Sequence, residues 1–339
     1  MDALAAKLSA LPLFTGLPEA DVRAAALMWE ERSLQEGARL WEHGEPAGEL
    51  GVLLSGRLRA HIDARTVGEV TAGEVVGEAA AWMGGLRTAS VQAEVPSTLA
   101  ILQTDQLSQL RSAHAAVYDC LLQQALLGLA GRIRQVDREI AKLAYGEGSA
   151  PGRRPQGRLA ELWQRLTSGS PGSPPAARQA LRAIPTLRIA DDETMKAIEA
   201  ALTARHLSAG ASLFLEGDPG DSVFVIADGC IDVIRHVRGG RGERLASLYP
   251  GALLGTGSLL LGERRNASCV AAASTACWVF EMNPRAFRAL GGEPGRAWRE
   301  SILEALRFQI SRADEQLARL KGSRATEAAD YERVRAGLV

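Results

Sequence analysis

Glu78 and Arg87, two residues of opposite charge, lie nine positions apart in the segment Gly73–Val91, which we call loop A. Within it, Gly77 and Glu78 precede three alanines, and Arg87 is followed by a hydroxyl side chain. A glycine before small residues at a helix start leaves backbone N–H groups free to bind an anion. The guanidinium of Arg87 can grip a phosphate with two parallel hydrogen bonds, and the carboxylate of Glu78 can accept from ribose hydroxyls. Loop A therefore predicts a site for a nucleotide whose phosphate is folded back onto its sugar.

A second copy of this pattern lies further along the chain. Gly37 corresponds to Gly210 at an offset of 173 residues, and Arg87 corresponds to Arg265 at an offset of 178. The extra residues fall in Val237–Glu243, a Gly- and Arg-rich segment typical of a hairpin tip, where insertions are tolerated. A repeat of this length indicates a duplicated domain, because solenoid repeats are only about 20–50 residues long.

Both copies predict the same series of elements. A helical lead-in, Leu8–Leu34 or Leu181–Leu207, precedes short strands such as Leu50–Leu54 and Ser222–Ile226. Gly or Pro interrupts the strands at intervals of roughly 8–12 residues, a spacing typical of a barrel or a sandwich.

An amphipathic closing helix ends each copy, after a last strand at Thr98–Gln103 or Thr275–Glu281. Ile133–Leu143 in the first closing helix aligns with Ile310–Leu320 in the second. Apolar residues in the first helix recur with the three-and-four spacing of a packed stripe. They are Leu126, Leu129, Ile133, Val136, Ile140 and Leu143. We expect the stripe to cover the barrel, and part of it to form a homodimer seam or a ligand lid.

These patterns divide the chain into four parts. Two domains, 1–145 and 176–322, flank a linker at 146–175 that is rich in Gly, Ser and Pro. A polar tail follows at 323–339.

The composition, 46% hydrophobic and 23% charged, is that of a soluble globular protein. The net charge of −1 offers no electrostatic basis for binding nucleic acid or an anionic membrane. No apolar run approaches the roughly 20 residues that span a bilayer, and the N-terminal segment lacks the basic region of a signal peptide. The four cysteines lack close paired spacing and are expected to be buried free thiols. We therefore expect a cytoplasmic protein.

Loop A and the repeat resemble the cyclic nucleotide-binding domain shared by catabolite activator proteins, protein kinase regulatory subunits and nucleotide-gated channels. Gly210–Ile234 resembles the glycine-punctuated strands of that family. Gly77–Ala89 resembles its phosphate cassette, with the Glu-to-Arg spacing of kinase regulatory subunits, whose tandem order is also similar. The resemblance implies an α+β fold of two double-stranded β-helix (jelly-roll) barrels, each flanked by N-terminal helices and a C-terminal lid helix.

The resemblance also implies roles for the residues of loop A. Glu78 would accept from the ribose 2′-OH, Arg87 would pair with the cyclic phosphate, and Thr88 would reach the phosphate or the purine edge. Backbone N–H groups would complete the site, whose predicted residues are Gly77, Glu78, Ala79, Ala80, Arg87, Thr88 and Ala89. The ligand would be cAMP or cGMP, and Thr88 does not decide between them. Candidates for a lid over the base are Arg134, Gln135, Arg138, Tyr145 and Trp163.

The corresponding segment of the second copy, Gly251–Cys269, departs from this pattern, and we call it loop B. Thr256 stands where loop A has its glutamate, and Ser258 replaces an alanine. A threonine hydroxyl is too short to replace a carboxylate on the ribose, so we expect no ordinary cyclic mononucleotide here. We also expect Glu263 to neutralise Arg265 in the empty pocket. The second candidate site comprises Gly255, Thr256, Arg265 and Asn266.

We expect a regulatory protein that binds a cyclic mononucleotide in the first domain and signals to an unidentified protein partner. The signal would travel by movement of the lid helix and of the domains. A transcription factor of the catabolite activator type is disfavoured, because no helix-turn-helix follows the last closing helix. The alternative is a scaffold that binds protein and no nucleotide.

We expect neither an enzyme nor a bound cofactor or metal. No Ser-His-Asp, metal-ligand or paired-carboxylate arrangement stands out, and the histidines are scattered along the chain. They are His43, His61, His114, His206 and His236.

Overall fold

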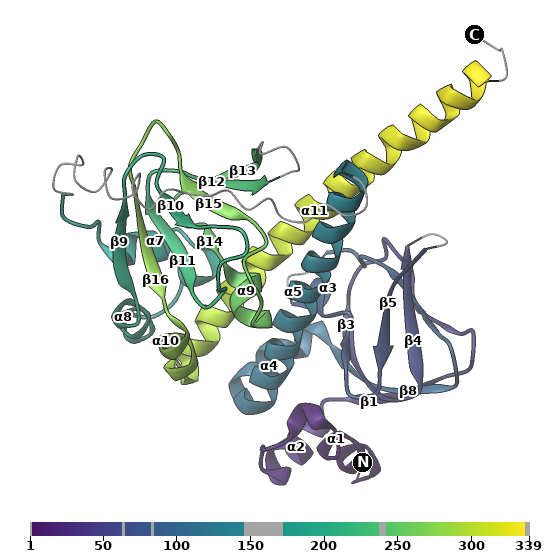
Figure 1. Ribbon diagram of the computed structural model, residues 1–339. Coiled ribbons are helices and arrows are strands. Elements are labelled where there is room, and N and C mark those ends of the chain that lie inside the picture. Colours follow the sequence, from purple (N-terminus) through teal and green to yellow (C-terminus); the bar gives the residue numbers. More distant parts are fainter. Residues whose placement is uncertain (1, 63–64, 83–84, 146–171, 237–241, 336–339) are drawn as a thin grey trace. The chain divides into compact units, whose positions relative to one another are not determined.

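The computed structural model describes residues 2–62, 65–82, 85–145, 172–236 and 242–335. The chain divides into two compact units, Met1–Leu126 and Leu127–Val339, each with one barrel of strands (Figure 1). The division falls inside a long helix, α5 (Ala115–Tyr145), so the later part of α5 belongs to the second unit. Most of the predicted linker, and Trp163 within it, lie outside the described residues.

In its described residues, the first unit contains short helical segments, the first part of α5 and eight strands. Its helical segments are α1 (Asp2–Ser9), η1 (Pro12–Phe14), α2 (Glu19–Ala26), α3 (Glu78–Ala81), η2 (Thr104–Gln106), α4 (Leu107–Ala113) and the first part of α5. Its strands are β1 (Glu30–Leu34), β2 (Arg39–Trp41), β3 (Glu49–Ser55), β4 (Arg57–Ile62), β5 (Arg65–Thr71), β6 (Val75–Val76), β7 (Ser90–Ala93) and β8 (Ser97–Gln103).

The strands of the first unit form two antiparallel sheets with a shared core. The strand orders are β1-β8-β3-β6 and β2-β7-β4-β5. Successive side chains of a strand point to opposite faces of its sheet, so each sheet turns alternate apolar residues inward. Trp41 and Leu58 from one sheet meet Leu53 and Leu99 from the other in this core. Loop A runs from β6 through α3 to β7, so it passes from one sheet to the other.

The second unit repeats the strands of the first in the same chain order, with helices before and after them. Its helical segments after the linker are α7 (Ala177–Arg182), η3 (Pro185–Leu187), α8 (Asp192–Ala200), α9 (Thr256–Leu261), α10 (Pro284–Ala289) and α11 (Gly292–Arg335). Its strands are β9 (Thr203–Leu207), β10 (Ser212–Phe214), β11 (Val223–Asp228), β12 (Ile231–His236), β13 (Gly242–Leu248), β14 (Leu253–Leu254), β15 (Ser268–Ala271) and β16 (Cys277–Met282).

The strand orders of the second unit are β9-β16-β11-β14 and β10-β15-β12-β13, the same as in the first unit. The predicted α+β class is confirmed, with two four-stranded antiparallel sheets and flanking helices in each domain. The duplication predicted from the repeat is therefore present in the topology as well as in the sequence.

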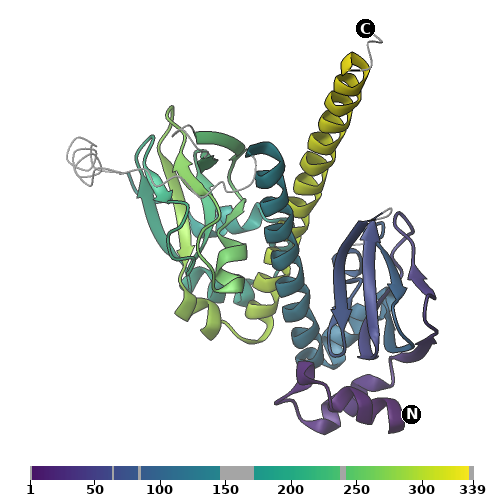
Figure 2. The same ribbon diagram turned by 45° about the vertical axis from the view of Figure 1, so that its right-hand side comes forward.

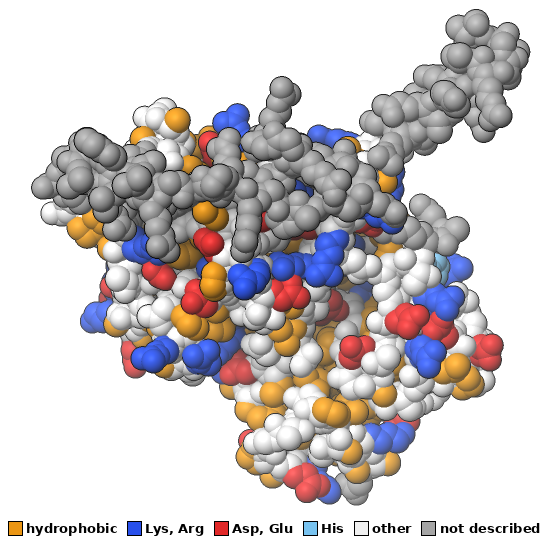
Figure 3. All heavy atoms as spheres, viewed as in Figure 1, with side chains coloured by type: hydrophobic (Ala, Val, Ile, Leu, Met, Phe, Trp, Pro, Cys, Tyr) orange, Lys and Arg blue, Asp and Glu red, His pale blue; other side chains and the backbone are white. Residues whose placement is uncertain are grey.

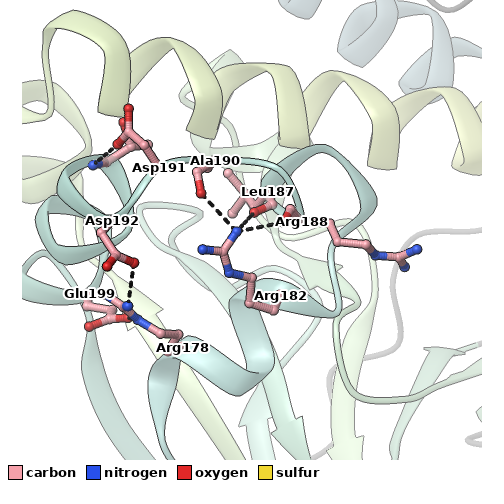
Figure 4. Close-up of polar contacts among 9 residues, drawn as sticks. Arg178, Arg182, Leu187, Arg188, Ala190, Asp191, Asp192 and Glu199 are labelled. Atoms are coloured by element: carbon pink, nitrogen blue, oxygen red, sulfur yellow. Dashed lines mark hydrogen bonds and ion pairs between the residues drawn. The ribbon is translucent and has the colours of Figure 1, made fainter.

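A cluster of polar contacts joins α7, η3 and α8, the helical segments that precede β9 (Figure 4). One nitrogen of Arg182 donates to three carbonyl oxygens, one at the end of η3 and two in the turn that follows, at 2.6–3.1 Å. Arg178 bridges Asp192 at 2.8 Å and Glu199 at 2.6 Å, and Asp191 caps the start of α8. The cluster fixes the surface against which α11 packs, since α11 contacts both η3 and α8.

Two helices of the second unit lie side by side. Figures 1 and 2 both show the later part of α5 next to α11, and Arg132 of α5 pairs with Asp314 of α11 at 2.9 Å. Five residues of the apolar stripe predicted for α5 are buried and the sixth is half-buried, so the packed stripe is confirmed. A homodimer through the closing helices stays a prediction.

Two predicted boundaries differ from the structure. The lead-ins end as strands, because β1 and β9 occupy the residues up to Leu34 and Leu207 that were predicted to be helical. The strand β1 pairs with the distant strand β8, with Glu30 opposite Ile101. This long-range pairing overrides the local helical pattern. The helix α11 continues to Arg335, through most of the segment predicted to be a polar tail.

The distribution of charge on the surface agrees with the composition, and the cysteine prediction is confirmed in part. Basic and acidic side chains are interspersed on the face shown in Figure 3. Among the described residues, no helix has both the length and the apolar character needed to cross a bilayer. All four cysteines are free, but only Cys269 and Cys277 are buried, and burial raises the pKa of these two thiols to about 12. Cys120 and Cys230 are half-buried, so the prediction of burial is wrong for them.

Candidate functional site

Loop A brings a glycine, a short helix and an arginine together. Gly77 follows β6 with a φ of 82°, and α3 begins at the next residue, Glu78, as predicted. A Cβ atom at Gly77 would lie 2.6 Å from Nη1 of Arg87 and 2.7 Å from the ring of Trp41. The position therefore requires glycine for its left-handed backbone and also for the close approach of the arginine.

Arg87 is the buried cation of this loop. Only 4% of its surface is exposed, and Nη2 donates to the carbonyl oxygen of Glu49 at 2.8 Å. Its Nε and Nη1 atoms are buried and find no hydrogen-bond partner among the described residues. Burial lowers the pKa of Arg87 to about 10, against the attraction of nearby carboxylates, so the side chain stays charged at neutral pH. A buried polar group of this kind calls for a partner, and an anion would supply it.

The ring of Trp41 lies against Arg87, and the carboxylate of Glu49 holds that ring in place. The guanidinium carbon lies 3.6 Å from the ring centroid of Trp41, a cation–π contact. The indole Nε1 of Trp41 donates to Glu49 at 2.8 Å, and Arg32 forms an ion pair with the same carboxylate. Burial acts to raise the pKa of Glu49, but the hydrogen bonds from Arg32 and Trp41 outweigh it and leave that pKa below its ordinary value.

The other predicted residues of loop A lie around this arginine. Glu78 is half-buried at the start of α3, and its charge is close enough to raise the pKa of Arg87. Thr88 and Ala89 follow the arginine directly and are half-buried, while Ala80 is buried. The structure thus places the predicted residues on one loop and helix start, including the backbone of Ala79. Their roles toward a ligand stay predictions.

Three supporting residues, Arg32, Trp41 and Glu49, were not singled out in the sequence. Their positions in the second copy carry Arg205, Phe214 and Ser222. The first two positions keep their chemical type in both copies, a basic residue and an aromatic residue. Alignment of the two copies could therefore have drawn attention to Arg32 and Trp41.

Loop A also contacts the helix that closes its own unit. Trp82, directly after α3, donates from Nε1 to the hydroxyl of Tyr118 at 2.9 Å. The two ring centroids are 5.7 Å apart. Tyr118 is buried near the start of α5. A shift of α3 would therefore displace the start of α5 through this contact.

Loop B holds its arginine in the same backbone frame. Gly255 has a φ of 78°, and Arg265 donates to the carbonyl oxygens of Gly255 at 3.0 Å and Ser222 at 2.8 Å. The guanidinium carbon lies 4.3 Å from the ring centroid of Phe214. Arg265 is 4% exposed, and its Nε is buried without a partner in the described part of the chain. Thr256, at the glutamate position, is fully buried.

A cavity of about 220 Å³ adjoins loop B. It is bounded by the barrel, by the later part of α5 and by α11, all within the second unit. Asp137 of α5 accepts from Nδ2 of Asn266 at 2.7 Å and lies 3.6 Å from Arg235. Burial raises the pKa of Asp137, against the attraction of Arg235 and the hydrogen bond from Asn266.

Arg134, predicted as a lid residue, also lies against loop B. Its Nε pairs with Glu263 at 2.5 Å, and its Nη1 donates to the carbonyl oxygen of Arg264 at 3.0 Å. Glu263 therefore pairs with Arg134, and the prediction that it neutralises Arg265 is wrong. The other lid candidates on the helix, Gln135 and Arg138, are exposed. The side chain of Tyr145 lies outside the described part of the structure.

A comparison with protein families matches both copies. The family profile described as cyclic nucleotide-binding domain matches residues 31–114 and 204–292, together about half of the chain. No curated protein matches the chain.

Several solved structures are similar to the chain at low identity. The regulatory domain of Toxoplasma gondii PKA with cAMP is 19% identical, with 88% of this chain and 94% of that chain covered and a TM-score of 0.31. The regulatory subunit of a cAMP-independent protein kinase A from Trypanosoma brucei is 16% identical, with 100% and 95% covered and a TM-score of 0.30. A cyclic nucleotide-binding domain from Methylobacillus flagellatus is 25% identical, with 42% and 83% covered and a TM-score of 0.35. With TM-scores this low, family membership rests on the profile.

Proposed function

The chain belongs to the cyclic nucleotide-binding domain family, and we propose that its first copy binds a cyclic mononucleotide, cAMP or cGMP, as a regulatory signal. In this proposal the protein is a non-catalytic sensor, and any catalytic activity belongs to its protein partner.

The buried guanidinium of Arg87 is the observation that carries this proposal. Two of its nitrogens lack hydrogen-bond partners among the described residues, although the side chain is almost fully buried. Glu49 and Trp41 already fix its orientation, so little conformational entropy is lost when a phosphate binds. A cyclic phosphate has two oxygens outside its ring, which suits the planar fork of donors on a guanidinium.

The remaining residues of loop A supply the sugar and phosphate contacts. Glu78 accepts from the ribose 2′-OH, a role that a half-buried carboxylate at the start of α3 can fill. Backbone N–H groups of Ala79, Ala80 and Ala89 donate to the phosphate, and Thr88 adds a hydroxyl beside Arg87. Thr88 is compatible with a contact to either purine, so both cAMP and cGMP remain in the proposal.

The output of binding is a shift between two conformations. A ligand that draws α3 toward its phosphate also moves Trp82, whose hydrogen bond to Tyr118 links the movement to α5. The ligand changes the population of this state only as far as it binds the two conformations with different affinity. The partner would then recognise the state in which α3 and α5 have moved.

A thermal shift screen with cAMP, cGMP and cyclic dinucleotides tests the proposal. At a hundredfold excess over its dissociation constant, a ligand adds about 2.7 kcal/mol to the free energy of unfolding. For a domain of this size, that addition raises the melting temperature by several degrees. The absence of any shift at millimolar cAMP and cGMP would favour the alternative, a scaffold that binds no nucleotide.

A further inference from the structure

In the second unit, the donors around loop B converge on a carboxylate of the chain itself. Asp137 of α5 accepts a hydrogen bond from Asn266, and the guanidinium of Arg235 lies 3.6 Å away. Asn266 holds the position that Thr88 holds in loop A, and Arg235 holds the position of Ile62 in β4. An anion is therefore already present beside loop B, and it is a side chain.

The remaining charges of this pocket are mostly positive. Arg235, Arg265 and Arg312 line the cavity, and the nearby Arg134 is engaged by Glu263. Arg265 is more than nine-tenths buried and keeps an unpartnered Nε among the described residues. Because Thr256 replaces the glutamate, loop B supplies no carboxylate at that position. If Asp137 moved away, Arg235 would lose the carboxylate that lies beside it, and Arg265 would still present its unpartnered Nε on the wall of the cavity.

We propose that this pocket binds an organic phosphate monoester, whose phosphate replaces the Asp137 carboxylate on Arg235 and Asn266. The proposal goes beyond the function of the first copy, since it concerns another site and another class of ligand. Phe214, Leu248 and Phe308 give the cavity an apolar wall for the body of the ligand.

The charge of the ligand follows from the two arginines. A phosphate monoester carries about −1.5 to −2 charges at neutral pH, which matches Arg235 and Arg265 together. A cyclic phosphate diester carries a single charge, and its ribose would find no carboxylate acceptor at Thr256. The pocket therefore favours the monoester over the cyclic nucleotide. The displaced Asp137 is repelled by the bound phosphate, so binding loosens the later part of α5.

Calorimetry with 5′-AMP, cAMP and adenosine as probes tests this competition in the full chain. Asp137→Asn keeps the shape of the side chain but removes the resident anion. We expect this variant to bind 5′-AMP about tenfold tighter than the parent, with adenosine unchanged. Glu139→Gln is the matched control, because it removes the same charge from the same helix at a residue that pairs with Lys321. The control should bind 5′-AMP like the parent.

Two further variants identify the groups that the phosphate meets. The double variant Asp137→Asn/Arg235→Gln removes both charges of the pair, leaves neither one buried alone, and should lose the tenfold gain. Asn266→Ala alters an exposed side chain and should weaken 5′-AMP binding even if the Asp137 variant does not fold. Equal affinity of parent and Asp137→Asn, an equal gain for adenosine, a gain that survives in the double variant, or unchanged binding by Asn266→Ala would each overturn the proposal.

The same titrations in an Arg87→Ala background separate this site from the first copy. A gain for 5′-AMP that persists without Arg87 belongs to the second unit, whereas a gain that disappears there would overturn the assignment. Failure of the cyclic nucleotide proposal leaves these outcomes unaffected, because its own test is the response to cAMP and cGMP.

Discussion

The two loops hold their arginines in the same way and surround them with different chemistry. Arg87 and Arg265 each donate to the carbonyl at the start of the corresponding strand segment, and each lies against an aromatic ring. In loop A, a carboxylate at Glu78 stands beside the arginine, while in loop B the same position is a buried threonine. A duplicated fold can thus keep the frame that positions a cation while side-chain replacement changes what that cation can bind.

The loops also differ in how they meet the closing helix. Trp82 and Tyr118 link loop A to α5 by a hydrogen bond. Their counterparts in the second copy are Leu260 and Gly295, which offer neither a donor nor an acceptor side chain. Loop B instead reaches the later part of α5, where Asn266 donates to Asp137 and Glu263 pairs with Arg134. Each loop therefore has a polar link to a helix, but the two links are made by different residues at different points of the loop.

The largest expected contrast between the copies is in the arginines themselves. Arg87→Ala removes the buried charge that would face the phosphate of the proposed ligand, and we expect a loss of about 2–5 kcal/mol in cyclic nucleotide binding. Arg265→Ala, the matched change in loop B, should leave that affinity and a stoichiometry of one ligand per chain unchanged. Calorimetry on both variants makes the comparison, with circular dichroism to check that each is folded. Two sites of similar affinity, one of them lost with Arg265, would show that loop B is a working cyclic nucleotide pocket.

A smaller effect is expected when loop A is given the residue of loop B. Glu78→Thr removes the acceptor that we propose for the ribose hydroxyls, and each polar group left unpaired in a buried site costs about 1–3 kcal/mol. Cyclic nucleotide affinity should fall about tenfold or more, but less than with Arg87→Ala. A 2′-deoxy analogue of the ligand should lose affinity for the parent and lose little more for the variant. Equal discrimination against the deoxy analogue by both proteins would place the ribose contact elsewhere.

The site was partly predictable from the sequence because the repeat aligns its charged and glycine positions. Gly77, Glu78 and Arg87 are adjacent or nearly so along the chain, and their local spacing is enough to bring them together. The stacking of Trp41 on Arg87 was not predictable in this way. An aromatic residue on a strand fits a core position equally well, and only the folded barrel shows which cation it meets.

The ion pair between Asp137 and Arg235 beside loop B could not be predicted from the sequence for the same reason. Asp137 lies in a helix whose apolar stripe predicts a packed face, and its partners Arg235 and Asn266 come from the barrel almost a hundred residues or more away. The strands β1 and β9 were missed because pairing with a distant strand, not local propensity, decides their conformation. Long-range contacts thus account for the main differences between prediction and structure.

Removal of the hydrogen bond between loop A and α5 should have a moderate effect on cyclic nucleotide binding. Tyr118→Phe keeps the ring but removes the acceptor of the Trp82 N–H, a loss of about 0.5–1.5 kcal/mol for one hydrogen bond. We expect cyclic nucleotide affinity to fall a few-fold and the ligand-induced change in hydrogen exchange at the start of α5 to shrink. Tyr249→Phe, at a tyrosine that is 63% exposed in the second unit, is the matched control. A ligand-induced change as large in Tyr118→Phe as in the parent would mean that another contact carries the signal.

The smallest expected effect is a pH dependence that only the first copy can show, because Ser222 replaces Glu49 in the second. The pKa of Glu49 is held below its ordinary value by Arg32 and Trp41, so the ionised carboxylate stabilises the folded state. This contribution is fully present above the unfolded pKa of about 4.3 and is lost as the pH falls through the folded pKa. Glu49→Gln should therefore unfold at lower urea concentration than the parent at pH 7, with a difference that shrinks progressively below about pH 4. Glu36→Gln, which neutralises an exposed carboxylate of the same unit, should match the parent throughout. A difference for Glu49→Gln that stayed constant from pH 7 to pH 3 would mean that Glu49 supports Trp41 and Arg87 through packing alone.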